Sequence, residues 1–486
     1  MVKQNLDCIF NPSSIVIAGV STKGKLLQLG GNIILQALLS CGFKGEIYPL
    51  NPKGGEVSGL KVYTSIKDVP GTVDYAICCI SAPQVPQFIQ DCIAKGVKAV
   101  HVYTGGFSES GTDEGKQLEE NIFSLSHRSG IRILGPNCLG VYNPKAGLSF
   151  SPGLPSEGGT TSIICQSGGI SFFLTREIIN RGAMFNKLIS YGNACDINES
   201  DLLEYLATDV DTKVIGIYIE GVKEGGRFSR LLKETANAKP IIVLKAGLSE
   251  AGARAAASHT GVLAGSGKIW DVLLHQAGAI KVDSLEELVD TIITFQFLPS
   301  SIGRKVGVIG GGGGSSVLTT DYCTNAGLVM PRLSRKIQDK LRSYFVNGVA
   351  GATFNNPVDL SERGWNIYYD CIKAMLDYRG IDLLIYQFPM GMHPALFPYP
   401  EMEFMSNLIA DNIIKAYRKS SKPMAVVIHS SVTVEDYQAA LNCKQRCSEA
   451  GLPVYHSVIN AAKAIARFTN YHERRGTIAD KAGFPC

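Results

Sequence analysis

The residue with the clearest capacity for chemistry is His259, which stands in the segment RAAASHTGVLAGS. Small residues and glycines flank it on both sides, so its imidazole has room to be reached or to move. An imidazole titrates near neutral pH and can act as a nucleophile or carry a proton. From the residues alone a structural histidine remains an open alternative. The other histidines stand in ordinary settings.

Three glycine-containing turns are candidates for binding an anion. They are GVSTKGK at 19–25, QSGGIS at 166–171 and GGGGGSS at 310–316. Each follows a predicted strand, where glycine lets the backbone approach a phosphate and the next helix offers free N–H groups. In the second turn a strand ends at Cys165, and Ser167, Gly168 and Gly169 open a helix, which predicts an anion cradle. The five glycines of the third turn indicate close approach of a backbone or a ligand, without showing which.

The first turn is not a GxGxxG fingerprint, yet Gly19, Ser21, Lys23 and Gly24 suit a phosphorylated ligand. Lys53, in NPKGG, comes at the end of the next predicted strand, where a residue that reads ribose or phosphate would project. Two structural alternatives stay open here. The turn could simply close a strand-helix unit, and Lys53 could be an ordinary surface lysine.

The composition describes an ordinary globular protein. With 486 residues the chain exceeds a single hydrophobic core, so we expect about three domains. The formal charge of +4 comes from 47 basic and 43 acidic residues without a clustered basic face, which predicts no nucleic-acid partner. The 13 cysteines are odd in number, and no apolar run approaches the roughly 20 residues of a membrane span. We therefore expect a cytoplasmic chain with no membrane partner and no structural metal.

Short apolar runs alternate with helix-length amphipathic stretches along the chain. The first runs are SIVIAGV at 14–20, YAICCIS at 75–81 and AVHVYTG at 99–105. The alternation predicts an α/β fold, with parallel strands covered by helices on both faces. Breaks rich in glycine, proline and serine divide the chain into a Rossmann-like domain at 1–144, a second α/β domain at 145–300 and a third at 301–486.

Over nearly its whole length the sequence resembles the α subunit of ADP-forming acetyl-CoA synthetase, in the succinyl-CoA synthetase superfamily. Two long segments carry the resemblance, SYGNACDINESDLLEYLATDVDTKVIGIYIEGVKEG and KAGLSEAGARAAASHTGVLAG. Shorter matches are IAGVSTKGK, YPLNPKGGEVSGLKVYTSI, ILGPNCLGVYNP and CQSGGIS. The resemblance implies a CoA-binding Rossmann domain followed by two flavodoxin-like α/β domains, the first of which holds a phosphohistidine.

The resemblance also implies a catalytic pair. His259 would be the phosphorylated nucleophile, and Glu220, in YIEGV, would be the carboxylate that holds its imidazole. The chemistry agrees with this assignment, because a carboxylate that accepts from one imidazole nitrogen fixes the tautomer and stabilises the imidazolium formed when the other nitrogen attacks phosphorus. Without His259, a strand-end glutamate on the surface would be the preferred interpretation of Glu220.

The binding residues follow from the same resemblance. The residues that would contact CoA are Ser21, Thr22, Lys23, Lys53, Ile80, Ser81 and Ala82. Ser167, Gly168 and Gly169 would hold the phosphate, Phe172 would lie beside the acyl group, and Asn137 would share that cavity. The sequence departs from the family pattern in two places: SAP replaces the usual proline-alanine at the CoA strand end, and the loop GVSTKGKLLQLGG differs.

No segment after residue 300 resembles an ATP-grasp module. The resemblance therefore implies a separate ATP-grasp β subunit that binds ADP or ATP with Mg²⁺, and an α2β2 assembly. The implied reaction interconverts acyl-CoA, ADP and phosphate with a small carboxylate, CoA and ATP, through an acyl phosphate and phosphohistidine. The alternatives are a non-catalytic CoA-binding or acyl-CoA-sensing subunit, which the presence of both His259 and Glu220 disfavours, and an NAD-dependent oxidoreductase, which the absence of GxGxxG disfavours. The acid and the choice between ADP and GDP stay open.

Overall fold

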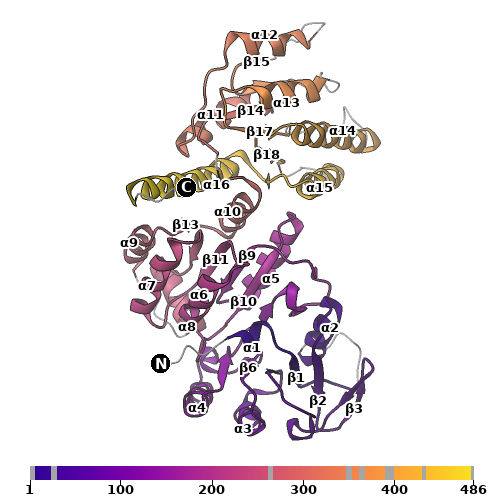
Figure 1. The fold of residues 1–486 in the computed structure, drawn as a ribbon, viewed down its shortest axis with the longest axis vertical. Helices are drawn as coiled ribbons and strands as arrows, with labels where there is room; N and C mark the ends of the chain where they lie inside the picture. Colours follow the sequence, from indigo (N-terminus) through magenta and orange to yellow (C-terminus); the bar gives the residue numbers. More distant parts are fainter. Residues whose placement is uncertain are drawn as a thin grey trace. The chain divides into compact units, whose positions relative to one another are not determined.

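The chain divides into two compact units, which Figure 1 shows in a computed structural model. The structure describes residues 6–22, 30–260, 266–300, 302–345, 353–360, 367–388, 399–429 and 434–482. Unit 1 comprises Met1–Arg176 and Met184–Ser284, and unit 2 comprises Glu177–Ala183 and Leu285–Cys486. Each unit is built from predominantly parallel sheets and helices, so the predicted α/β fold class is confirmed.

The first sheet of unit 1 is parallel, with the strand order β2-β1-β5-β6-β7. The strands are β1 Ser14–Ala18, β2 Glu46–Leu50, β5 Tyr75–Cys78, β6 Ala99–Val102 and β7 Arg132–Leu134, and a hairpin of β3 Gly55–Val57 and β4 Leu60–Val62 follows β2. The helices are α1 Asp7–Phe10, α2 Gly31–Cys41, α3 Val85–Lys95 and α4 Asp113–Ser129, with 3-10 turns η1 Ile66–Asp68, η2 Ala82–Gln84, η3 Ser108–Ser110 and η4 Pro144–Ala146. Because β2 and β5 flank β1 on opposite sides, the carboxyl ends of β1 and β5 form a topological switch point, where open α/β sheets bind ligands.

The second sheet of unit 1 has the order β13-β12-β11-β9-β10-β8, in which only β8 is antiparallel to its neighbour among the described pairings. The strands are β8 Gly140–Tyr142, β9 Thr161–Cys165, β10 Phe185–Ser190, β11 Val214–Ile219, β12 Ile241–Lys245 and β13 Ile280–Val282. The helices are α5 Gly168–Asn180, α6 Glu199–Thr208, α7 Gly225–Ala236, α8 Glu250–Thr260 and α9 Gly267–Ala277. β10 and β11 flank β9 on opposite sides, so the turn that leaves β9 is a second switch point.

The described strands of unit 2 form a sheet with the order β15-β16-β14-β17-β18-β19. The strands are β14 Val306–Gly310, β15 Thr353–Phe354, β16 Val358–Asp359, β17 Leu383–Gln387, β18 Met424–Val427 and β19 Val454–Tyr455. The helices are α10 Leu285–Phe297, α11 Gly313–Asn325, α12 Arg335–Ser343, α13 Tyr368–Asp377, α14 Tyr399–Arg418, α15 Val434–Glu449 and α16 Val458–Ala482. The glycine-rich turn at 310–314 follows β14, and a Cβ on Gly310 would lie 2.1 Å from the carbonyl oxygen of Gln387. Backbone approach therefore accounts for the first of the five glycines.

The end of α5 and the turn after it belong to unit 2, although their sequence neighbours belong to unit 1. Arg181 anchors this segment. Its guanidinium lies 2.6 Å from a carboxylate oxygen of Asp290 on α10 and donates to the carbonyl of Val454 on β19 at 2.5 Å. Both charged side chains are buried, Asp290 at 1% exposure.

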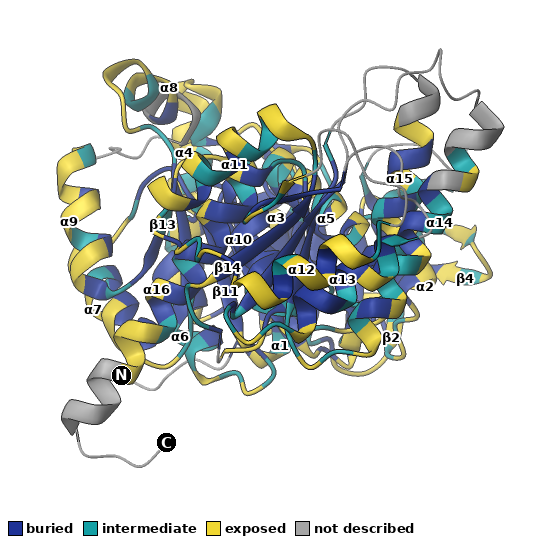
Figure 2. Cartoon of the chain, turned by 90° about the horizontal axis from the view of Figure 1, so that it is seen from above, coloured by how far each residue is buried: buried dark blue, intermediate teal, exposed yellow. Residues whose placement is uncertain are grey.

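Burial follows the layers of the fold. Figure 2 shows the buried residues concentrated on the central strands, whereas the covering helices and the peripheral strands β2 and β4 carry exposed residues. The central strands β1, β5 and β9 are buried at every position, which is why their sequences are mostly apolar and do not alternate with exposed polar residues. No helix in the described part of the chain is long and apolar enough to cross a membrane.

Candidate active site

The two switch points of unit 1 open onto one cavity of about 610 Å³. It is lined by residues 79–81, 103–105, 137–139, 166–169 and 192–193, together with Gly30. The first three groups follow β5, β6 and β7 of the first sheet, and the last two follow β9 and β10 of the second. The cavity thus brings together Ile80 and Ser81, expected to contact CoA, with Asn137 and the Ser167–Gly168–Gly169 turn, expected to bind phosphate and the acyl group.

The first predicted turn, at 19–25, lies at the same edge of the sheet. Its described residues, 19–22, do not line this cavity. Gly19 has a φ of +93°, and a Cβ there would lie 2.5 Å from the carbonyl oxygen of Cys79. The close crossing of two strand ends therefore requires a glycine at this position. Ser21 is fixed by Asn32, whose side-chain oxygen accepts from the Ser21 N–H at 2.6 Å and whose amide donates to the Ser21 carbonyl at 3.0 Å. Lys23 lies outside the described residues.

Lys53 follows β2 on an exposed turn beside this edge. Its backbone N–H donates to the side chain of Asn51 at 2.9 Å, and the Asn51 amide donates to the Val20 carbonyl at 2.7 Å. Asn51 therefore ties the turn after β2 to the turn after β1. Thr22 is half-buried there, with its methyl group 3.4 Å from the place of a Cβ on Gly55. Thr22 and Lys53 therefore lie at the carboxyl-end edge of the first sheet, and neither lines the cavity.

The turn after β5 supplies one wall. Ile80 and Ser81 line the cavity, and the hydroxyl of Thr104, from the turn after β6, donates to the Ile80 carbonyl at 2.6 Å. Ala82 is buried behind them at the start of η2. Of the three residues predicted at this strand end, Ile80 and Ser81 therefore line the cavity, whereas Ala82 is buried and does not.

A second wall comes from two turns that pack against each other. Asn137 has a left-handed φ of +59°, and its N–H donates to the Thr104 carbonyl at 3.0 Å. The N–H of Asn193 donates to the Pro136 carbonyl at 3.0 Å, which joins the turn after β10 to the turn after β7. Gly192 makes this packing possible, because its Cβ position lies 2.2 Å from the Pro136 carbonyl oxygen. The sequence did not predict that Gly192 and Asn193 line the cavity. The SYGN segment that contains them carried only the resemblance to the family.

The first turn of α5 closes the cavity. Ser167, Gly168 and Gly169 line it, and the Ser171 hydroxyl donates to the Ser167 carbonyl at 2.8 Å. A Cβ on Gly168 would lie 3.3 Å from Leu139, whereas a Cβ on Gly169 would meet nothing within 4 Å. The N–H groups at the start of a helix carry a partial positive charge and suit an anion. Phe172 is 40% exposed on the same helix and lies outside the described lining.

Glu220 is buried at the carboxyl end of β11. Its N–H donates to the side-chain oxygen of Gln166 at 2.8 Å, and the Tyr218 hydroxyl donates to its carboxylate at 3.3 Å. The ammonium of Lys245 donates to the Glu220 carbonyl at 2.8 Å and lies 5.3 Å from the centre of the Trp270 ring. Burial lowers the pKa of Lys245 to about 8. His259 is in the last turn of α8, but its side chain lies outside the described residues, so the predicted pair of His259 and Glu220 stays a prediction.

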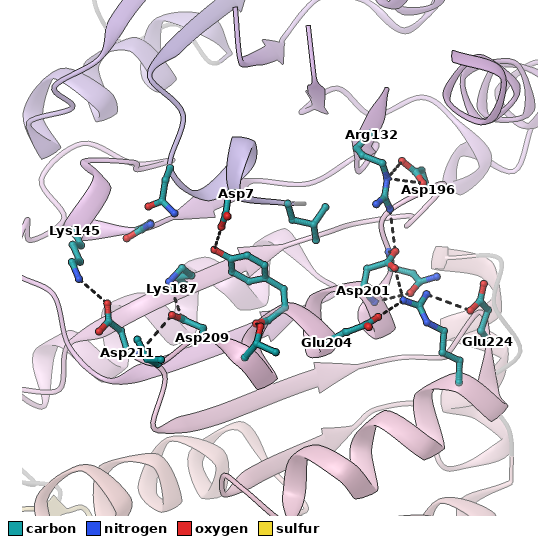
Figure 3. Close-up of a pocket in the computed structure, with 18 of the residues that line it drawn as sticks. Asp7, Arg132, Lys145, Lys187, Asp196, Asp201, Glu204, Asp209, Asp211 and Glu224 are labelled. Atoms are coloured by element: carbon teal, nitrogen blue, oxygen red, sulfur yellow. Dashed lines mark hydrogen bonds and ion pairs between the residues drawn. The ribbon is translucent and has the colours of Figure 1, made fainter. Parts of the chain in front are cut away.

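A second and larger cavity of unit 1, of about 1690 Å³, has a different character (Figure 3). Its wall is a set of ion pairs: Arg132 with Asp196 at 2.9 Å, Arg227 with Asp201 at 2.8 Å, Lys187 with Asp209 at 2.8 Å and Lys145 with Asp211 at 2.7 Å. Arg132 belongs to the first sheet, whereas Asp196 precedes a helix of the second, so this pair joins the two sheets. None of the described residues predicted for a binding role lines this cavity. We therefore place the candidate active site in the smaller one.

Two known domains match the first 295 residues of the chain. Residues 13–144 match the CoA binding domain, and residues 158–295 match the succinyl-CoA ligase like flavodoxin domain. The fold and the cavity at the junction of these domains define a protein of the succinyl-CoA ligase class, whose first domain binds CoA.

Full-length relatives narrow this class. The chain is 35% identical over 464 residues to the α subunit of acetate–CoA ligase [ADP-forming] II of Pyrococcus furiosus, covering 94% of this chain and 96% of the relative. It belongs to the family of ADP-forming acetate–CoA ligase α subunits. The structure matches the solved dinucleotide forming acetyl-coenzyme A synthetase 1 of Ca. Korarchaeum cryptofilum in complex with phosphate and ADP, with a TM-score of 0.80 at 30% identity over 98% of this chain and 99% of that one.

Some relatives are longer than this chain. An ADP-forming acetate–CoA ligase of Methanocaldococcus jannaschii is 39% identical over 360 residues, which cover 73% of this chain and 49% of the relative. The resemblance found in the sequence is confirmed, as is the CoA-binding character of the N-terminal domain. Relatives named as α subunits also imply a partner subunit. The roles of single residues remain predictions.

Proposed function

We propose that this chain is the α subunit of an ADP-forming acyl-CoA ligase, which interconverts acyl-CoA, phosphate and ADP with a carboxylate, CoA and ATP. The observation that supports the proposal most is the single cavity of about 610 Å³, onto which strand ends of the CoA-binding domain and the first turn of α5 both open. Such a cavity suits a thioester on one side and a phosphate at a helix N-terminus on the other.

The reaction divides into three transfers. Phosphate attacks the thioester carbonyl, the C–S bond breaks, CoA leaves as the thiolate and an acyl phosphate forms. An imidazole nitrogen of His259 then attacks phosphorus, and the P–O bond to the departing carboxylate breaks. Finally the phosphoryl group passes from His259 to ADP. Dividing one difficult exchange into smaller steps is what covalent catalysis supplies.

The chain's own residues have distinct roles in this scheme. The free N–H groups at the start of α5 stabilise negative charge on the transferring phosphoryl group without rearranging during the reaction. Glu220 accepts from the second nitrogen of His259, which stabilises the imidazolium while the first nitrogen carries phosphorus. Lys245 holds the backbone of Glu220 in place, because its ammonium donates to the Glu220 carbonyl oxygen at 2.8 Å. Ile80 and Ser81 border the space for CoA.

We assign the nucleotide to an ATP-grasp β subunit in an α2β2 assembly. The support is the length of the longer relatives: the chain covers 49% of the Methanocaldococcus jannaschii ligase and 64% of an ADP-forming acetate–CoA ligase of Archaeoglobus fulgidus. A nucleotide-binding module fits in the part of those relatives that this chain does not match.

The test is intact-mass analysis of the chain after incubation with its co-expressed ATP-grasp partner, ATP and Mg²⁺. Wild type is expected to gain the mass of one acid-labile phosphoryl group, whereas His259→Ala gains none. Glu220→Gln is expected to gain the group more slowly, because its amide no longer carries the charge that stabilises an imidazolium. Absence of the gain in wild type, with the partner shown to bind nucleotide, would favour a non-catalytic acyl-CoA-sensing subunit instead.

A further inference from the structure

Gln166 joins the cavity to the strand that carries Glu220. It stands between the end of β9 and the start of α5, it lines the cavity, and its side chain is 3% exposed. Its backbone N–H donates to the Tyr218 carbonyl on β11 at 3.2 Å. Main chain and side chain of Gln166 therefore both contact β11 and the turn that follows it.

The orientation of the Gln166 amide is fixed by its partners. Oε1 accepts from the N–H of Glu220 at 2.8 Å and from the N–H of Gly221 at 3.4 Å. Only the oxygen can accept from two N–H groups, so these contacts assign the two ends of the amide. Nε2 must then point away from β11.

Nε2 of Gln166 has no hydrogen-bond partner among the described residues. Unlike the unpartnered side-chain atoms that are completely enclosed, it keeps some accessible surface. It therefore opens onto the cavity that the residue lines. Native proteins pair nearly all of their buried polar groups, so an available donor in a buried side chain points to a ligand. The adjacent N–H groups of α5 mark the same region as one that suits an anion.

We propose that Gln166 is a positioning residue whose Nε2 donates to an oxygen of the acyl phosphate while its Oε1 holds the backbone of Glu220. The inference rests on the proposed function and adds a link to it. Because the amide is planar and short, a ligand on Nε2 and the position of Glu220 depend on each other. The link serves the transfer between acyl phosphate and His259, which takes place in this cavity, and not the transfer between His259 and the nucleotide.

The experiment separates these two transfers in the enzyme reconstituted with its partner subunit. The charging of the chain by radiolabelled ATP reports the nucleotide step, and the loss of label on addition of acetate and CoA reports the step in the cavity. Gln166→Glu keeps an oxygen for the Glu220 N–H but loses the donor and adds a negative charge. It is expected to charge at the wild-type rate and to discharge roughly 10- to 100-fold more slowly, the range of a lost hydrogen bond to a charged group.

Gln166→Met removes both ends of the link at similar size and is expected to slow both transfers. Gln117→Glu makes the same change of charge on the exposed face of α4 and should leave both rates unchanged. Equal slowing of the two transfers in Gln166→Glu, or no slowing of discharge, would overturn the role of Gln166. Failure of wild type to take up label is a separate result, because it would contradict the proposed function itself.

Discussion

A single methyl group on Gly192 should damage the cavity. Gly192 has a φ of +57°, and a Cβ there would lie 2.2 Å from the carbonyl oxygen of Pro136 and 2.5 Å from that of Asn137. Ordinary contact begins near 3.4 Å, so the turn that carries Asn137 would have to retreat by about 1 Å. The left-handed backbone itself costs a residue other than glycine about 1–2 kcal/mol.

Gly278 provides a matched control. It follows α9 in the same left-handed region, with a φ of +76°, and a Cβ there would meet nothing within 4 Å. Gly278→Ala is therefore expected to lose about 1–2 kcal/mol of unfolding free energy and to keep full activity. Gly192→Ala should lose more unfolding free energy than Gly278→Ala. It should also lower turnover about 100-fold, because it shifts a wall of the cavity by about 1 Å.

Two measurements on each variant check this prediction. Hydrogen exchange of peptides from β9 and β10 gives the local stability, which avoids treating a chain with two units as a single two-state transition. Turnover of acetyl-CoA by the reconstituted enzyme gives the activity. The reasoning is refuted if Gly192→Ala and Gly278→Ala lose the same stability and both keep wild-type turnover.

Two further predictions concern buried charges. Burial favours the neutral amine of Lys245 and lowers its pKa from 10.5 to about 8 in the folded chain. Between these two pH values the unfolded chain binds one more proton than the folded chain. As the pH rises through this range, the free energy of unfolding of wild type should therefore increase by about 3 kcal/mol relative to Lys245→Met. Urea unfolding of both proteins from pH 7.5 to 10.5, followed by a probe placed in unit 1 so that unit 2 does not contribute, measures this difference, and parallel pH profiles would contradict it. Arg181→Met leaves the buried carboxylate of Asp290 unpaired and should lower the stability of unit 2 by about 3–5 kcal/mol, measured by hydrogen exchange in α10. Breaking the exposed pair of Arg230 and Glu234 with Arg230→Ala should cost less than about 1 kcal/mol, and similar losses in the two variants would count against the buried-pair argument.

The local sequence pattern was sufficient to predict the strands at the centre of the first sheet. The runs at 14–20, 75–81 and 99–105 contain β1, β5 and β6, because fully buried parallel strands are apolar on both faces. The turn QSGGIS was likewise expected to open a helix, and α5 begins at Gly168. The sequence could also place glycines at turns, but it could not show that Gly19 is required by a neighbouring carbonyl.

Contacts between distant segments lay beyond the sequence. Gln166 and Asn193 reach the cavity only because strands of the second sheet end beside the turn that carries Asn137, an arrangement that no spacing along the chain contains. The assignment of α10 to unit 2 has the same cause, since it depends on contacts rather than on breaks in composition. The domain boundaries at 144 and 300 and the role of His259 stay predictions.

The discontinuity of unit 2 bears on how genes of this family can be rearranged. The unit needs Glu177–Ala183 as well as Leu285–Cys486, and Arg181 supplies the charge that balances Asp290. If the gene were split once between the two stretches, it would give two polypeptides, neither of which would contain the whole of unit 2. Fusion or fission at the ends of the chain leaves both units intact. Recombination that exchanges partner modules is therefore expected to occur at the termini, and a transplanted C-terminal unit should require the residues around Arg181 to travel with it.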